Sequence, residues 1–132
     1  MLQLEEIDHV ALAVRDVQRT AQWYIDVLGF EHRLQGMWDG VPVFIGKGTT
    51  ALALFQASET AVLPSSRPNR IGMLHLAFRA SRAEFIAAQR ELEARSIAFQ
   101  SQDHEISRSI YFNDPDGIEL EITTYELSES RA

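Results

Sequence analysis

The spacing of apolar positions along the chain alternates between the period of a strand and that of a helix. Residues 5–14 alternate between two faces, which predicts a strand with one buried side. Asp16 is a suitable N-cap for a helix that continues to Leu28, and Gly29 can end that helix in the left-handed conformation. Three strand-like runs follow at 30–38, 41–46 and 50–56, with a hairpin turn expected at Asp39-Gly40.

The same order begins again in the second half of the chain. Residues 57–70 contain two prolines and no clear period, which indicates a linker. A strand is predicted at 71–79, and Ser81 with Glu84 forms a capping box that opens a helix ending near Arg95. Three strand-like runs complete this half at 97–101, 107–113 and 118–124, with a turn at Asp114-Pro115-Asp116-Gly117 before the last.

Both halves therefore predict the order strand–helix–strand–strand–strand, which is an α+β pattern. A chain of 132 residues fits one compact domain or two small modules packed together. We expect a single domain over 1–132, with a first module at 4–56, the linker at 57–70 and a second module at 71–125. In an internal repeat, chemically similar residues at equivalent places gain weight as candidates for a common site.

Metal-ligand residue types stand at matching places in the two modules. His9 and His75 each lie on the first strand of a module, and Glu121 lies on the last strand of the second. Alternation places each of them on a small or polar strand face, opposite a face of bulky aliphatic side chains. Two histidines and one carboxylate can hold a single divalent metal. Glu119 shares a face with Glu121 and remains the alternative carboxylate, and a lone strand histidine is often structural.

Composition excludes several other classes of function. The net charge of −7 comes with no basic cluster for a nucleic-acid backbone, and no apolar run approaches the roughly 20 residues that span a membrane. The absence of cysteine excludes disulfides and thiolate ligands and fits a reducing cytoplasm. The N-terminus lacks the basic start and apolar stretch of a signal peptide, so we expect a cytoplasmic protein.

Four segments resemble the vicinal oxygen chelate superfamily, which includes glyoxalase I, bleomycin-binding proteins, fosfomycin-resistance enzymes and extradiol dioxygenases. They are DHVALAV with His9, WYIDVLGF at 23–30, MLHLAF with His75 and YFNDPDGIELEI with Glu121. The resemblance implies two βαβββ modules that form a curved mixed sheet around a metal-binding cavity. It also implies one divalent metal per site (Fe, Mn, Zn or Ni), with the ligating glutamate four residues after the DPDG glycine. That spacing favours Glu121 over Glu119.

The chain departs from glyoxalase I at the fourth ligand. Members like glyoxalase I carry a glutamate on the last strand of the first module, whereas TTALALFQ has no carboxylate and places Phe55 at the equivalent point. The remaining set of two histidines and one carboxylate is typical of fosfomycin-resistance enzymes and extradiol dioxygenases.

A second group of residues resembles the extradiol dioxygenases more specifically. His104 and Tyr111 match the spacing of a histidine and a tyrosine that these enzymes place beside the metal, where they contact substrate or oxygen. Both are therefore candidate catalytic residues. A further active-site histidine of the two-domain dioxygenases has no counterpart, because 57–74 contains no histidine. The alternatives are a surface-loop histidine for His104 and a packed strand aromatic residue for Tyr111.

The resemblance implies an enzyme that acts on a small molecule with two neighbouring oxygens, and an extradiol-like dioxygenase is the preferred interpretation. A redox-neutral lyase or isomerase and a fosfomycin-type thiol transferase are alternatives. A binding protein of the bleomycin type, without catalysis, belongs to another class and generally lacks the complete metal triad. Single-chain members commonly form two-fold dimers in which His9 of one chain meets His75 and Glu121 of the other, so we expect a homodimer with sites shared between chains. The linker at 57–70 also allows the alternative, in which the two modules of one chain build the site together.

Overall fold

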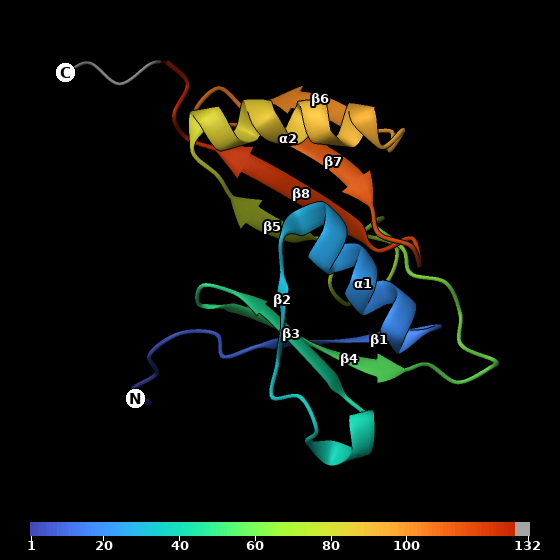
Figure 1. Cartoon of the computed structure of the whole chain (residues 1–132). Coiled ribbons are helices and arrows are strands. Elements are labelled where there is room, and N and C mark those ends of the chain that lie inside the picture. The colour runs from blue at the N-terminus through green and yellow to red at the C-terminus, as the bar shows by residue number, and fades with distance from the viewer. Residues whose placement is uncertain (129–132) are drawn as a thin grey trace. The chain divides into compact units, whose positions relative to one another are not determined.

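The computed structural model describes residues 1–128, which divide into two compact units at Val62 and Leu63. The elements of the first unit are β1 (Val10–Val14), α1 (Val17–Leu28), β2 (Glu31–Arg33), the short 3₁₀ helix η1 (Trp38–Gly40), β3 (Val43–Lys47) and β4 (Thr50–Gln56). Those of the second are β5 (Leu76–Arg79), α2 (Arg82–Ala94), β6 (Gln100–Asp103), β7 (Arg108–Asn113) and β8 (Glu119–Thr124). Each unit is a βαβββ module, as the sequence predicts (Figure 1).

The two modules have the same sheet topology. Their strand orders are β1-β4-β3-β2 and β5-β8-β7-β6, and in each the first strand is parallel to the fourth while the other pairs are antiparallel. The parallel register is equivalent as well, with Val10 opposite Leu52 and Leu76 opposite Leu120. The predicted fold class is therefore confirmed.

Local capping interactions fix the ends of α1. The side chain of Asp16 accepts a hydrogen bond from the Arg19 N–H at 3.1 Å, and Gly29 at φ 73° ends the helix through its N–H to Ile25. Between these ends, the helix is amphipathic, and Ala21 and Tyr24 are fully buried. α1 lies against β3 and β4, and this arrangement covers the aliphatic face of the first sheet.

A side-chain cap also fixes the N-terminus of the second helix, α2. Ser81 accepts a hydrogen bond from the Glu84 N–H at 3.1 Å, and its own hydroxyl lies 2.9 Å from the Glu84 carboxylate. Phe85 and Leu92 are the buried side chains of α2, which lies against β8. The opposite face of each sheet carries no helix of its own module and holds the predicted ligands.

Several predicted strands are longer than the strands observed. β1 begins at Val10 instead of residue 5, because its partner β4 pairs with it only from Leu52 onward. β5 begins at Leu76 instead of residue 71, and β2 ends at Arg33 instead of residue 38. His9 and His75 therefore immediately precede their strands.

Two local predictions are also corrected. Asp39-Gly40 is not a two-residue hairpin turn, because it lies in η1 within a longer connection between β2 and β3. The strand predicted at 97–101 begins at Gln100 instead, because the Ile97 N–H still bonds to the Leu92 carbonyl at the end of α2.

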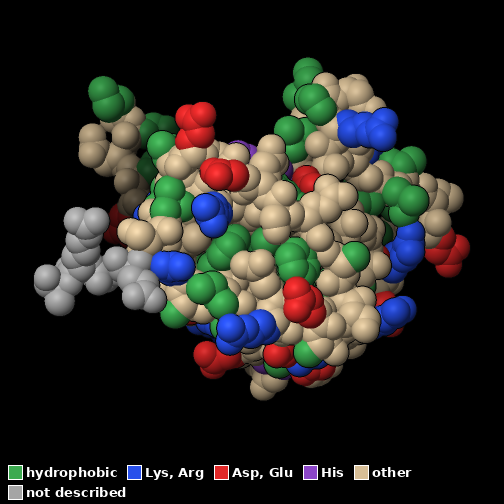
Figure 2. All heavy atoms as spheres, turned by 90° about the horizontal axis from the view of Figure 1, so that it is seen from above, with side chains coloured by type: hydrophobic (Ala, Val, Ile, Leu, Met, Phe, Trp, Pro, Cys, Tyr) green, Lys and Arg blue, Asp and Glu red, His purple; other side chains and the backbone are tan. Residues whose placement is uncertain are grey.

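The net charge of −7 does not produce a uniformly acidic surface. On the face seen in Figure 2, Lys and Arg side chains are interspersed with Asp and Glu. None of the helices within residues 1–128 has the length and apolar character needed to cross a bilayer.

Candidate metal centre

Glu121 occupies the middle of the second sheet. β8 runs between β5 and β7, and its register places Glu121 opposite Ala77 on one side and Tyr111 on the other. The strand is positioned by the preceding turn, in which the Asp114 carboxylate accepts the N–H groups of Asp116 at 2.8 Å and Ile118 at 3.0 Å. Glu121 is only 8% exposed, so its carboxylate needs polar partners to offset desolvation.

His75 supplies one of these partners. Its Nε2 lies 3.0 Å from Oε1 of Glu121, and its Nδ1 lies 3.6 Å from Oε2 of Glu119. The two carboxylates therefore approach opposite nitrogens of one imidazole ring. A metal bound through Nε2 would be next to Glu121, whereas Glu119 is placed to orient the ring from the other side.

Ser109 supplies the second partner of Glu121. Its hydroxyl donates to Oε2 of Glu121 at 2.5 Å and lies 3.0 Å from the hydroxyl of Thr123. Ser109 is fully buried on β7. The oxygen of Glu121 that faces His75 is thus distinct from the oxygen that Ser109 holds, which leaves Oε1 directed at the imidazole.

Tyr111 and His104 meet in the same module. The Tyr111 hydroxyl lies 2.9 Å from Nε2 of His104, and the Tyr111 ring packs edge-on against His75 with ring centroids 5.8 Å apart. Burial raises the pKa of Tyr111, and the negative charge of Glu121, together with a hydrogen bond to it, adds to the rise. The tyrosine therefore stays a neutral hydroxyl at neutral pH and can donate a hydrogen bond.

His9 lies in the first module, on the sheet face that carries Phe44. Its ring packs edge-on against that of Phe44 with centroids 5.3 Å apart, and its Nδ1 lies 2.7 Å from Oδ2 of Asp8. Both predicted histidine ligands thus have a carboxylate beside Nδ1, Asp8 for His9 and Glu119 for His75.

The donor chemistry fits a divalent metal, although only part of the predicted set comes together within one module. The structure brings His75, Glu121, Tyr111 and His104 into one neighbourhood of the second module, and it places His9 in the first. Within residues 1–128, no three His, Asp or Glu side chains form a metal-binding group. Imidazole nitrogen and carboxylate oxygen are nonetheless the donors that Zn, Mn and Fe share.

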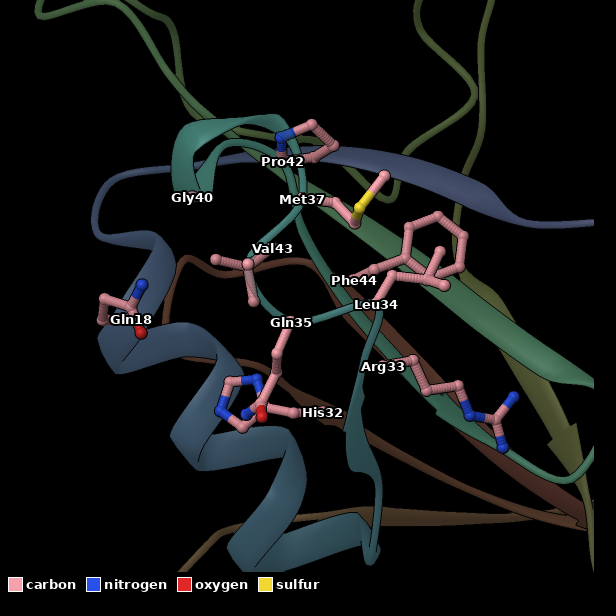
Figure 3. A pocket seen from close by; sticks show the side chains of 11 residues that line it. Gln18, His32, Arg33, Leu34, Gln35, Met37, Gly40, Pro42, Val43 and Phe44 are labelled. Atoms are coloured by element: carbon pink, nitrogen blue, oxygen red, sulfur yellow. The ribbon is translucent and has the colours of Figure 1, made fainter.

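Phe55 and His32 lie outside this group of residues. Phe55, which stands where a fourth ligand would be expected, is exposed on β4. His32 lines a pocket of about 250 Å³ in the first module, together with Gln18 of α1, residues of the connection between β2 and β3, and the strand residues Arg33, Val43 and Phe44 (Figure 3). His32 is thus on the helix side of β2, away from the sheet face that carries His9.

The chain has clear relatives of known family. The family model described as the Glyoxalase/Bleomycin resistance protein/Dioxygenase superfamily matches residues 6–122. The chain therefore belongs to this superfamily, most of whose members are metal-dependent enzymes, and the resemblance identified in the sequence is confirmed.

Relatives within this superfamily carry different activities. The chain is 26% identical over 125 residues to the glutathione transferase FosA of Serratia marcescens, covering 95% of this chain and 84% of that protein. It is 28% identical over 117 residues to the catechol-2,3-dioxygenase of Bacillus subtilis, covering 88% of this chain and 40% of that protein. The structure of a lactoylglutathione lyase from Agrobacterium tumefaciens superimposes with a TM-score of 0.72 at 27% identity, covering 96% and 98% of the two chains.

Sequence reasoning alone did not identify Ser109 as a hydrogen-bond partner of Glu121. The available signal was its position two residues before Tyr111, which places both side chains on the face that carries Glu121.

Proposed function

We propose that this protein is a metal-dependent enzyme whose substrate binds the metal through two neighbouring oxygens. The ligands would be His9, His75 and Glu121. The observation that carries this proposal is the approach of Nε2 of His75 to Oε1 of the buried Glu121, at 3.0 Å, which brings two metal-donor atoms together. At His9, the Asp8 carboxylate lies 2.7 Å from Nδ1, which favours the Nδ1–H tautomer and leaves the Nε2 lone pair for a metal, as is usual for metal-binding histidines.

The bound metal would act as a Lewis acid and a template for the two substrate oxygens. The residues of the chain would provide the rest. Ser109 holds one oxygen of Glu121 and keeps the other available, which fixes the carboxylate before a metal arrives. Three protein ligands would leave coordination positions open for the substrate.

The preferred reaction is extradiol-like ring cleavage of a catechol. The Tyr111 hydroxyl, 2.9 Å from His104 and close to His75, supports this choice because it can donate a hydrogen bond to an oxygen bound near Glu121. His104 lies on an exposed turn, so it can exchange a proton between the site and solvent. The similarity to the catechol-2,3-dioxygenase of Bacillus subtilis gives independent support.

A redox-neutral reaction is the second candidate. The similarities to a glutathione transferase and to a lactoylglutathione lyase favour it. The same ligands would then hold a metal that serves only to polarise the substrate, and Tyr111 would orient it. We also propose a homodimer with sites shared between chains and a cytoplasmic location, the latter supported by the absence of cysteine.

Metal content after expression without added metal tests the ligand set. We expect one divalent metal per chain, strongly reduced by His9→Ala, His75→Ala or Glu121→Ala. Glu119→Gln should weaken metal binding about tenfold to 100-fold, since it only orients His75. His32→Ala is the matched control and should retain the metal. A Glu119→Gln protein without metal, beside a Glu121→Ala protein that keeps it, would reverse the ligand assignment.

Oxygen uptake separates the two reaction classes. The protein is loaded anaerobically with Fe(II), mixed with a panel of catechols and then exposed to oxygen. An extradiol enzyme should consume one O₂ per catechol and form a yellow ring-opened product. Intact metal binding without oxygen uptake across the panel would favour the redox-neutral candidate. That candidate is tested by measuring thiol consumption by the manganese-loaded protein in the presence of epoxide substrates.

A further inference from the structure

Arg33 lies on the same face of the first sheet as His9. The β2–β3 register places Arg33 opposite Phe44, whose ring packs against His9 at a centroid distance of 5.3 Å. Figure 3 shows Arg33 and Phe44 extending to one side of β2 and β3, whereas His32 extends to the other. Arg33 therefore belongs to the face that carries the candidate ligand and not to the layer beneath α1.

A glycine on the neighbouring strand makes room for the Arg33 guanidinium. A Cβ added at Gly46 would lie 2.5 Å from Nη1, 2.6 Å from Cζ and 2.7 Å from Nε of Arg33. Gly46 is buried within β3 and is not one of the glycines with positive φ. Its missing side chain is thus explained by the guanidinium that lies across it, and any larger residue would displace that group.

The strand register relates this guanidinium to His9. Gly46 pairs with Ala51 of β4, and continuing the β1–β4 register by one residue from Val10 and Leu52 places His9 beside Ala51. His9 and Gly46 are therefore two strands apart, or roughly 10 Å across the sheet. The position between them is occupied by the small side chain of Ala51.

The charge of Arg33 has no partner in its own module. In the part of the first module that the structure describes, no carboxylate is ion-paired with Arg33. Glu31 is the carboxylate that the strand register brings nearest to the Arg33 guanidinium, because Glu31 pairs with Gly46 and shares the sheet face of Arg33. Among the described residues, Glu31 and Arg33 nevertheless form no ion pair. A half-buried guanidinium laid flat on the sheet thus keeps its donors available.

We infer that Arg33 binds an anionic group of the substrate, a carboxylate or a phosphonate, while the two neighbouring oxygens of that substrate occupy the metal. This inference rests on the proposed metal site at His9. The planar guanidinium matches either anion through paired hydrogen bonds. Arg33 would then determine specificity for anionic substrates and would take no part in the chemical step.

Matched probes on the cobalt-loaded protein test this inference without requiring turnover. The probes are neutral 4-ethylcatechol, 3,4-dihydroxyphenylacetate and (3,4-dihydroxybenzyl)phosphonate, and each dissociation constant is measured anaerobically from the cobalt absorption bands. We expect the wild-type protein to bind at least one anionic probe about tenfold more tightly than the neutral one. The two anionic probes distinguish the carboxylate from the phosphonate.

Four variants locate the effect. Arg33→Gln should abolish the preference and leave the affinity for 4-ethylcatechol unchanged. Gly46→Ala keeps the charge but displaces the guanidinium, so it should also reduce the preference. Arg19→Gln, an exposed arginine on α1, is the matched control and should preserve it. Glu31→Gln should preserve or increase the preference, because a competing anion is removed.

The outcomes distinguish this inference from the proposed function. A wild-type protein that takes up no cobalt overturns both. A protein that takes up cobalt and binds 4-ethylcatechol, but binds the anionic probes no better, overturns only the role of Arg33. The same holds if Arg33→Gln keeps the full preference. Circular dichroism of each variant confirms that the compared proteins are folded.

Discussion

Glu121 is a buried carboxylate whose two oxygens have different partners. Oε1 lies 3.0 Å from Nε2 of His75, and Oε2 accepts the Ser109 hydroxyl at 2.5 Å. A carboxylate held in this way loses little freedom when it binds a metal, because its rotamer is already fixed by the sheet and by Ser109. The same arrangement favours Glu121 over Glu119, since Glu119 approaches the other nitrogen of the ring at 3.6 Å.

Tyr111 gives the sharpest test at this scale. Tyr111→Phe removes the hydroxyl that lies 2.9 Å from His104 but keeps the ring against His75. We expect turnover to fall about 100-fold with metal content unchanged, because a positioned hydrogen-bond donor is lost. Tyr125→Phe is the matched control, since Tyr125 is exposed beneath Arg79. A variant that is less stable but turns over normally would assign Tyr111 a packing role instead.

The sequence predicted these residues to different degrees. Alternation along the strands was enough to assign faces to His75, Glu121 and Tyr111, because it depends only on strand geometry. The contacts of Ser109 and the position of Arg33 over Gly46 could not be predicted. They depend on the register between strands and on side-chain rotamers, which a single sequence does not determine.

The turn before β8 is the element that positions the candidate carboxylate. Asp114 is 5% exposed and accepts two backbone N–H groups, and the Gly117 N–H bonds to its carbonyl at 3.1 Å. Gly117 adopts φ 87°, a conformation that suits glycine. The turn therefore sets where β8 begins and which face Glu121 occupies.

Replacing the Asp114 side chain should weaken the module. Asp114→Ala leaves the backbone N–H groups of Asp116 and Ile118 without their acceptor. We therefore expect the free energy of unfolding to fall by roughly 2 kcal/mol. Chemical denaturation followed by circular dichroism measures it. Asp103→Ala is the comparison. The exposed Asp103 side chain accepts the Glu105 N–H at 2.8 Å and no second backbone N–H within residues 1–128, so its loss should cost less than about 1 kcal/mol. Equal losses would show that the two turns contribute alike.

Helix ends were predictable at the scale of elements, whereas strand ends were not. Asp16, Gly29 and Ser81 act through hydrogen bonds to residues nearby in sequence, so the pattern identified them. The start of β1 at Val10 and the end of β2 at Arg33 depend on how far the pairing with the neighbouring strand extends. That information is distributed over distant segments of the chain.

At the scale of the whole molecule, the repeat places the candidate ligands at equivalent positions of the two modules. Each module exposes a sheet face that its own helix leaves uncovered, with His9 on one and His75 with Glu121 on the other. The internal repetition could be predicted because the order of periods recurs in the sequence. The connection from β4 to β5, at 57–75, contains no helix or strand.

The length of that connection permits both layouts. Residues 57–75 can reach roughly 60 Å when extended, at about 3.3 Å per residue. The modules of one chain could therefore form a site together, or a second chain could complete it. A two-fold dimer is the commonest closed assembly and would contain two equivalent sites. We expect the shared arrangement, in which His9 of one chain meets His75 and Glu121 of its partner.

Mixing two inactive variants decides between these layouts. His9→Ala and Glu121→Ala chains each lack one ligand and should bind little metal alone. In a shared arrangement, a mixed dimer contains one site with neither substitution and one with both, because the ligands of each site come from different chains. Mixing under conditions that exchange subunits should therefore restore metal to about half of the sites in mixed dimers. Exchange confirmed by mass spectrometry, without recovered metal, would place each site within a single chain.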